Sequence, residues 1–235
     1  LTSEAWFQQS ETPGLDGSDS AYGFNFQLRT PDKWSGDASY IELQENFNPA
    51  LGFTNRVGIR KIGSAVNYSV RPRDRFLRVV FGGLTYDRSE RLSDGSLQSE
   101  RLDFRFFIQN HTNDSFNPGC SRETEGLVRP FTILRARDPS NNVVIAPGEY
   151  EFDHCRVNLR AGNQRKFGGS FNYDWGEFFD GDRVSIRTTF SWRPSEHFSL
   201  AVSSRVNDIE LPEGQFTSRL TSLVAEVAFS SSLSW

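Results

Sequence analysis

Histidines and acidic residues are the side chains that could support acid–base or metal chemistry, and their spacing in this chain argues against both. His111, His154 and His197 are the three histidines, and they lie far apart in the sequence. The sequence contains neither the H-E-x-x-H pattern of zinc hydrolases nor the G-x-S-x-G turn that presents a nucleophilic serine. We therefore predict no catalytic residue, no cofactor-binding residue and no metal ligand.

The densest acidic cluster lies in the segment WGEFFDGD. Its carboxylates belong to Glu177, Asp180 and Asp182, and clustered oxygens of this kind are the ligands that Ca²⁺ prefers. A polar hairpin loop that turns at Gly181 explains the same residues without a metal. We favour the loop interpretation, and we favour it for the acidic pair in LDGSDS as well, because neither segment matches an EF-hand loop.

Arginines recur within segments where apolar and polar residues alternate, and this alternation predicts the elements that carry the arginines. In DRVSIRTTFSWRPSEHFSLAVSSRV, one set of alternate positions is apolar and the other set is polar and contains Arg187 and Arg205. A period of two is typical of β-strands, and the short RPSEH between the two halves predicts a turn. The apolar positions are Val184, Ile186, Phe190, Trp192, Phe198, Leu200 and Val202.

The same alternation recurs in AYGFNFQLR, IGSAVNYSV, LDFRFFIQ, GSFNYDWG and TSLVAEVAF. In FLRVVFGGLTY it places Leu77, Val79 and Phe81 together on the apolar side. In GEYEFDHCRVNLR the apolar phase changes after Phe152, which predicts a β-bulge near Asp153. We expect about twelve strands of roughly ten residues, which is the length of membrane-spanning strands.

The connections between these segments alternate in character along the chain. Tight turns alternate with longer polar connections along the chain. The tight turns include RPRDR, NHTND and RPSEH, and the longer connections include ENFNPALGFTNRVG, GEFFDGD and NDIELPEGQ. An up-and-down barrel with short turns on one side and long loops on the other produces this alternation. A sandwich with Greek-key crossovers does not. The apolar residues within ENFNPALGF suggest a loop that packs on itself or inside the barrel, and a docking loop is the alternative.

Composition favours a barrel over a protein with a thick core. Only 36% of the 235 residues are apolar, whereas 14% are aromatic, and the mean hydropathy is -0.54. A membrane β-barrel needs apolar residues only on its outer face, and its interior is polar. The chain has no apolar run long enough for a membrane-spanning helix. A net charge of -4 gives no indication of nucleic-acid binding.

Two cysteines, Cys120 and Cys155, do not form a metal-binding motif. They are either one disulfide formed in an oxidising compartment or two unrelated thiols, and the sequence leaves both open.

Because a charged side chain in the middle of the bilayer is costly, the charged residues of the strands are expected to face a lumen. Such residues either form cross-strand pairs that stiffen the wall or line a channel for anionic or sugar-like solutes. The candidate lumen-facing residues are Arg29, Arg78, Arg105, Asp174, Arg187, Arg205, Arg219 and Glu226. The candidate lipid-facing residues are Phe24, Phe104, Phe171, Phe190, Trp192 and Phe229.

Several stretches resemble a known family, and they occur in that family's order: ENFNPALGF, SVRPRDRF, RPFTI with APGEYEF, FFDGDRVSI and WRPSEHFSL. The family consists of bacterial outer-membrane proteins whose full-length members join an N-terminal domain resembling family 9 carbohydrate-binding modules to a C-terminal barrel region of uncharacterised function. The resemblance implies location and fold, and it assigns no functional residue.

The sequence therefore predicts an all-β protein, an antiparallel up-and-down transmembrane β-barrel of the bacterial outer membrane. Residues 1–235 are expected to form a single barrel region, incomplete and part of a longer chain, because LSW after the SSS turn reads as the start of another strand. The expected role is a channel or surface component linked to glycan uptake or handling. Its expected partners are outer-membrane lipids and glycans or other small solutes. The alternatives are a secreted soluble β-sandwich that binds carbohydrate and a hydrolase whose site lies within a barrel.

The alternation makes a prediction that membrane assembly can test. Phe190→Arg should reduce the assembled fraction strongly, because an arginine facing lipid costs about 2–4 kcal/mol at the middle of the bilayer. Ser191→Arg is the matched control, since the neighbouring residue faces the other way. Equal assembly of the two variants, measured by heat-modifiable gel mobility, would contradict the facing assignment.

Overall fold

The fold is described from a computed structural model. The structure describes residues 1–15, 17–30, 33–49, 56–73, 75–138, 141–230 and 233–234, with the backbone alone described at 229, 230, 233 and 234. No helix in these ranges is long and apolar enough to cross a membrane.

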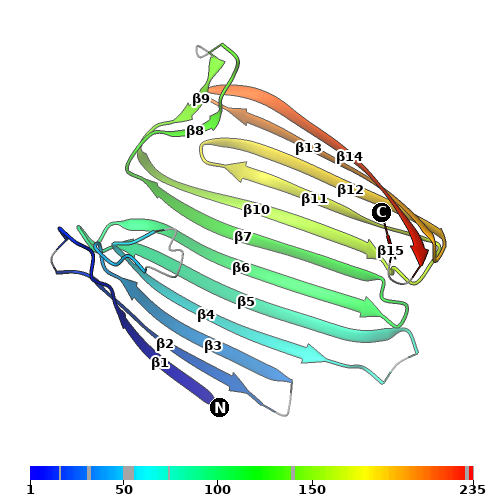
Figure 1. The fold of residues 1–235 in the computed structure, drawn as a ribbon, viewed down its shortest axis with the longest axis horizontal. Coiled ribbons are helices and arrows are strands. Elements are labelled where there is room, and N and C mark those ends of the chain that lie inside the picture. Colours follow the sequence, from blue (N-terminus) through cyan, green and yellow to red (C-terminus); the bar gives the residue numbers. More distant parts are fainter. Residues whose placement is uncertain are drawn as a thin grey trace.

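Twelve long strands form one antiparallel sheet in which each strand pairs with the next long strand along the chain (Figure 1). The two outer strands, β1 and β14, do not pair with each other, so hydrogen bonds do not close the sheet into a barrel. The long strands are β1 (Thr2–Gln9), β2 (Ser20–Arg29), β3 (Trp34–Leu43), β4 (Ile59–Val70), β5 (Leu77–Arg91), β6 (Leu97–Asn110), β7 (Ser115–Leu127), β10 (Gly148–Ala161), β11 (Phe167–Phe178), β12 (Gly181–Ser195), β13 (Phe198–Leu211) and β14 (Gly214–Ser230).

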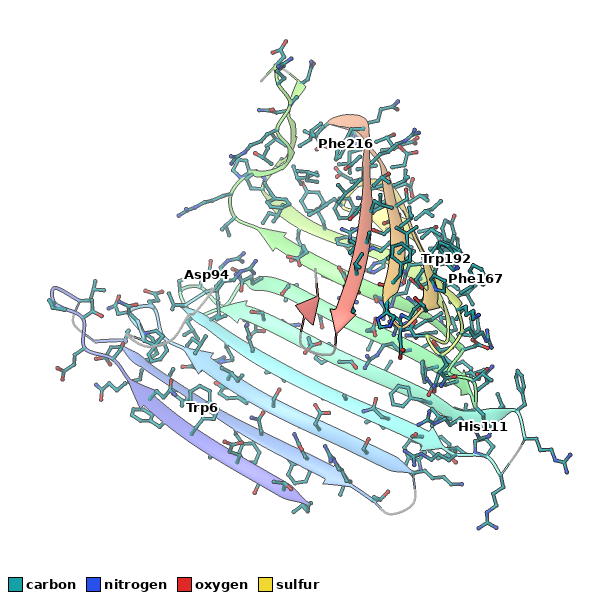
Figure 2. All side chains as sticks on the ribbon, turned by 45° about the vertical axis from the view of Figure 1, so that its right-hand side comes forward. Trp6, Asp94, His111, Phe167, Trp192 and Phe216 are labelled. Atoms are coloured by element: carbon teal, nitrogen blue, oxygen red, sulfur yellow. A yellow bond between two sulfur atoms is a disulfide. The ribbon has the colours of Figure 1, made fainter. Side chains whose placement is uncertain are left out.

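Three short strands complete the fold. β8 (Phe131–Leu134) and β9 (Val143–Ile145) form a hairpin within the connection from β7 to β10. β15 (Leu233–Ser234) pairs with the end of β14. The expected strand after the SSS turn corresponds to β15, although the turn itself includes residues outside the described ranges. The sheet is strongly curved, and in Figure 2 the C-terminal strands turn away from the plane of the N-terminal strands.

The connections alternate between two ends of the sheet. Asp94 and His111 lie in successive turns and mark the opposite ends (Figure 2). The end with the connections after β1, β3 and β7 is the loop end, and the opposite end is the turn end. The long connections predicted at GEFFDGD and NDIELPEGQ are wrong: only two residues separate β11 from β12, and two separate β13 from β14. The connection from β5 to β6, predicted long as well, has five residues. Cross-strand pairing extends the strands through these polar segments, regardless of their low hydrophobicity.

The register divides the sheet into two faces, because directly opposed residues of antiparallel strands point to the same side. We call the side shared with Phe190 the aromatic face and the side shared with Arg187 the polar face. Neighbouring pairs carry the assignment across the sheet, for example from Phe190 to Val202 and on to Leu223.

In two strands the predicted side of the apolar residues is wrong. In β5, Leu84 pairs with Phe104 on the aromatic face, so Phe81, opposite Phe107, lies on the polar face. In β10, the pairing with β7 runs without interruption, so the expected bulge near Asp153 is absent and Phe152 also faces the polar side.

Phe152 has an apolar environment on the polar face, which the rings of Phe178 and Phe179 provide. The ring of Phe152 lies 5.5 Å from that of Phe179. Phe179 in turn belongs to the buried cluster that β9 forms with the loop end of β13, together with Val143, Ile145, Ile209 and Leu211. A small hydrophobic core at the loop end thus explains the phase change that the sequence pattern attributed to a bulge.

A disulfide joins Cys120 of β7 to Cys155 of β10, which resolves the alternative that the sequence left open. The two cysteines are direct cross-strand partners on the aromatic face. Their Cα atoms are 4.0 Å apart.

Asp114 links two neighbouring connections at the turn end. Its carboxylate accepts hydrogen bonds from the Gly162 amide at 2.8 Å and from the Asn110 side chain at 3.0 Å. It also forms an ion pair with Arg165 at 2.7 Å. These donors, the Gly162 amide foremost, hold the pKa of Asp114 well below its ordinary value of 3.8. The carboxylate therefore stabilises the turn end in its charged form.

The stabilisation by Asp114 should depend on pH with a defined sign. A carboxyl whose pKa is lower when folded contributes fully above the unfolded value, near 3.8, and progressively less as the pH falls towards the folded value. Asp114→Asn should therefore be less stable than the wild type at pH 7, and the difference should shrink at pH 3. Denaturant unfolding in detergent at both pH values measures this. A difference that grows on acidification would contradict it.

Candidate functional site

The aromatic face carries the predicted lipid-facing side chains. The register places Phe24, Phe104, Phe171, Phe190 and Trp192 on this one face. Phe229 belongs to β14, but its side chain lies outside the described part of the chain. The shared face follows from the pairing, whereas contact with lipid stays a prediction.

Large hydrophobic side chains are exposed along this face from one edge of the sheet to the other. Phe7 in β1 is 65% exposed and Leu223 in β14 is 68% exposed. Among the exposed large hydrophobic residues described in the long strands, only Leu220 and Val224 lie on the polar face. The others form a continuous apolar band that includes Trp34, Val66, Leu84, Phe104, Leu159, Phe171 and Phe190.

Charged residues border the apolar band towards the loop end. Glu42 is 3.3 Å from Arg60, and Arg122 is 2.8 Å from Asp153. Arg219 belongs to this border: it pairs with Val206, and Val206 pairs with Ile186 on the aromatic face. The prediction that Arg219 shares a face with Arg205 is therefore wrong.

The position of Arg219 reflects an oblique boundary. Following the pairs from Arg219 through Val206, Ile186 and Tyr173 leads into the apolar band of the neighbouring strands. The charged border thus starts at Glu42 near the beginning of the sheet and moves along the register towards the turn end in later strands. Arg219 of β14 thus lies outside the apolar band, whereas Tyr173, which the chain of register pairs places in the same row of β11, lies inside it.

The remaining predicted lumen-facing residues lie on the polar face, with one exception. Register pairs place Arg29, Arg105, Asp174, Arg187, Arg205 and Glu226 there. Arg78 lies where the β5–β6 register shifts, so its pairing does not define a face, and its guanidinium donates to Asn113 Oδ1 at 2.6 Å. A lumen in front of the polar face stays a prediction.

A network of charges around Asp103 occupies the centre of the polar face. Asp103 is only 6% exposed. Its carboxylate accepts from Ser121 Oγ at 2.6 Å and from Arg156 Nη2 at 2.8 Å. Arg101 and Arg105 also approach it, at 3.3 and 3.4 Å. Cross-strand pairing explains the convergence, since Asp103 of β6 opposes Ser121 of β7.

Asp103, Ser121 and His154 are consecutive in one row across β6, β7 and β10. The three residue types are those of a hydrolytic triad, but their connectivity differs. The serine hydroxyl donates to Asp103, and His154 Nε2 lies 3.8 Å from Glu123. A nucleophile needs a hydrogen bond to its base. This row therefore forms a structural network.

Four buried polar atoms of the described residues lack a hydrogen-bond partner, and all lie on the polar face. They belong to Asn67, Thr85, Asn117 and His154, and their register pairs are Gly83, Asp103, Asn158 and Ser121. Buried polar groups normally have partners, either protein groups or ordered water. Water or a polar ligand on this face would supply them.

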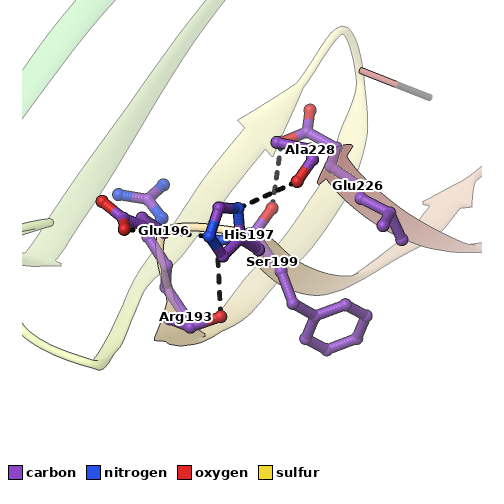
Figure 3. A pocket seen from close by; sticks show the side chains of 9 residues that line it. Arg193, Glu196, His197, Ser199, Glu226 and Ala228 are labelled. Carbon is purple, nitrogen blue, oxygen red and sulfur yellow. Dashed lines mark hydrogen bonds and ion pairs between the residues drawn. The ribbon is translucent and has the colours of Figure 1, made fainter. Parts of the chain in front are cut away.

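A cavity of about 490 Å³ lies at the turn end between β13 and β14 (Figure 3). His197 lies in the turn that precedes β13, and its Nδ1 is 3.0 Å from the Ala228 carbonyl oxygen. Ser199 Oγ donates to Glu226 at 2.9 Å. His197, Ser199 and Glu226 thus have partners within the protein, and Arg193 and Glu196 also line the cavity.

Among the residues that the structure describes, no three His, Cys, Asp or Glu side chains are grouped to hold a metal ion. Glu177 instead accepts a hydrogen bond from the Asp153 amide at 2.9 Å. In ENFNPALGF, Phe47 is buried, whereas Leu51 and Phe53 lie outside the described residues.

No protein-family model, no curated protein and no solved structure matches this chain.

Sequence patterns did not identify Ser121, Glu123, His154 or Arg156 as members of the central network. Alternation within β6 placed Asp103 and Arg105 on the polar side, but partners from other strands become visible only with the register. The missed signal was the polar run CSRETE in β7, which has no apolar alternation.

Removing the carboxylate of Asp103 should destabilise the sheet. Asp103→Asn leaves the arginines around it without their anion, and breaking a buried charge pair costs about 3 kcal/mol. Asp174→Asn is the matched control, since Asp174 lies on the same face in no ion pair of the described residues. Denaturant unfolding in detergent should show a large loss for the first variant and a small one for the second. Equal losses would contradict the central role of Asp103.

Proposed function

We propose that this chain forms the wall of a transmembrane β-barrel in the outer membrane of a Gram-negative bacterium, where it serves as a channel or surface component. The aromatic face contacts lipid and the polar face lines a hydrated lumen. The observation that carries the proposal is that the exposed large hydrophobic side chains described in the twelve long strands, except Leu220 and Val224, lie on a single face.

The size of the apolar band supports a membrane environment. Soluble monomeric proteins rarely expose contiguous apolar patches of more than a few hundred Å². A soluble sandwich covers such a face with a second sheet. In the described residues one sheet carries the fold, and its β8–β9 hairpin packs against the polar face instead. The aromatic face is therefore left for a partner, and lipid matches its chemistry.

The oblique charged border is a second support. Strands of a barrel are tilted by about 35–45° from its axis. An apolar belt perpendicular to that axis therefore begins at a different register position in each successive strand. The displacement from Glu42 in β3 to Arg219 in β14 has this character. A flat sheet packed on another sheet has no reason to shift its border in one direction.

The disulfide agrees with the proposed location. Disulfides form and persist in oxidising compartments, including the bacterial periplasm through which outer-membrane proteins pass. In hydrocarbon, the free amide and carbonyl groups of β1 and β14 must also be paired. We propose that these edges pair with one another or with further strands when the protein is in the membrane.

The side chains of the polar face support a proposal about which solutes the lumen binds. Arginine, asparagine and serine side chains alternate along β10 to β13, and such groups bind hydroxylated and anionic solutes. The resemblance to outer-membrane proteins with a carbohydrate-binding-like domain favours glycans or other small polar solutes. No catalytic step is proposed, because the connectivity of the Asp103 network leaves the serine bonded to the carboxylate. Nucleic acid is not among the proposed partners.

Quenching of tryptophan fluorescence by brominated lipids tests the proposal. Trp175 is on the aromatic face and Trp6 is on the polar face, opposite Gly23. In vesicles with brominated acyl chains, a variant that retains only Trp175 should be strongly quenched, and one that retains only Trp6 should not. The other tryptophans are replaced by phenylalanine.

Equal quenching of the two variants would overturn the facing of the wall. A protein that stays in aqueous solution without detergent, with neither tryptophan quenched, would overturn membrane insertion and favour the soluble carbohydrate-binding module.

A further inference from the structure

Two arginines oppose each other directly at the centre of the C-terminal half of the polar face. Arg187 of β12 is the cross-strand partner of Arg205 of β13, and both side chains are exposed. Side chains in such positions have Cβ atoms about 4.5–5.5 Å apart, and like charges placed this way are destabilising. The register therefore brings two positive charges together, and neither residue of the pair supplies a negative charge.

The arginines at the centre of this face differ in having carboxylate partners. Arg156 is 2.8 Å from Asp103, and Arg101 is 3.2 Å from Glu123. In the part of the chain that the structure describes, no ion pair joins Arg187 or Arg205 to an acidic side chain. The sheet thus neutralises its central arginines internally and leaves this pair to another anion.

The neighbours of the pair on this face are mixed. Leu220 lies opposite Arg205 on its other side, and Asp174 of β11 lies diagonally across from Arg187. The residue opposite Arg187 on its other side is Asn172, whose side chain accepts a hydrogen bond from Asn158. Arg160 lies on the same face of β10, opposite Ser170. The local surface therefore combines three guanidinium groups with amide and hydroxyl groups.

We propose that Arg187 and Arg205 form a binding site for an oxyanion, such as the carboxylate, sulfate or phosphate group of a polar solute. A guanidinium donates two parallel hydrogen bonds to such a group, and an anion between the two arginines replaces their repulsion by two attractions. Asn172 and Ser170 are suited to bind hydroxyl groups next to the anion. This inference rests on the proposed function only in placing the site in a lumen that solutes can reach.

Thermal unfolding of the full chain in detergent tests the site with inorganic sulfate as the probe. Sodium sulfate is compared with sodium chloride at equal ionic strength. Sulfate stabilises proteins in general through exclusion from their surfaces, so the readout is the difference between variants. The wild type should gain more in Tm from sulfate than the double variant Arg187→Gln with Arg205→Gln, which should retain only the general effect.

Arg219→Gln is the matched control, because it removes an arginine from the opposite face and should keep the full response to sulfate. Arg205→Glu is a second variant in which the repulsion becomes a cross-strand attraction. In chloride it should unfold at or above the temperature of the wild type, and it should lose the specific response.

The same response in the wild type and the double variant would overturn the oxyanion site. Loss of the response in the Arg219→Gln control would overturn it as well, because the effect would then follow net charge alone. Since the measurement is made in detergent, these outcomes are independent of the lipid-quenching result, which tests the proposed function separately.

Discussion

Directly paired residues of antiparallel strands point to the same side of a sheet, and this constraint organises the whole molecule. Because the side-chain period is two, a slip of one residue in any pair of strands would transfer every later side chain to the other face. The pairing from β1 to β14 keeps one facing throughout, with bulges confined to strand ends such as Leu77–Val79 and Trp192–Ser195. The apolar band and the charged network both depend on that continuity.

The two faces stabilise the sheet by different means. On the polar face, Asp103 and its arginines connect β6, β7 and β10 through charge-assisted hydrogen bonds, which hold strands in register as well as adding energy. Four buried polar atoms of the described residues on this face have no hydrogen-bond partner within the protein. The aromatic face offers exposed rings instead, such as Phe167 stacked on Trp192. One face therefore presents charged and polar groups, and the other presents exposed apolar side chains.

The loop end combines these principles in a small space. The β8–β9 hairpin packs against Phe179, Ile209 and Leu211, and with them it forms the only cluster of buried hydrophobic residues found among the described residues. A hairpin folded over this side narrows the space in front of the sheet at that end.

The alternation of Phe190, Trp192 and their neighbours was sufficient to predict strands, their number and most side-chain facings, because a strand's facing is a local property with a period of two. Local pattern could not assign Phe81 or Phe152, since an apolar residue fits either lipid or a small core, and only the hairpin reveals the core. Arg219 lies four residues before Leu223 in β14, so the period of two puts both on one side, and the pairing with Val206 agrees. The Cys120–Cys155 bond, the Asp103 network and the Arg187–Arg205 opposition each join different strands. Contacts of this kind depend on which strands are neighbours and in which register, and only the tertiary structure decides that.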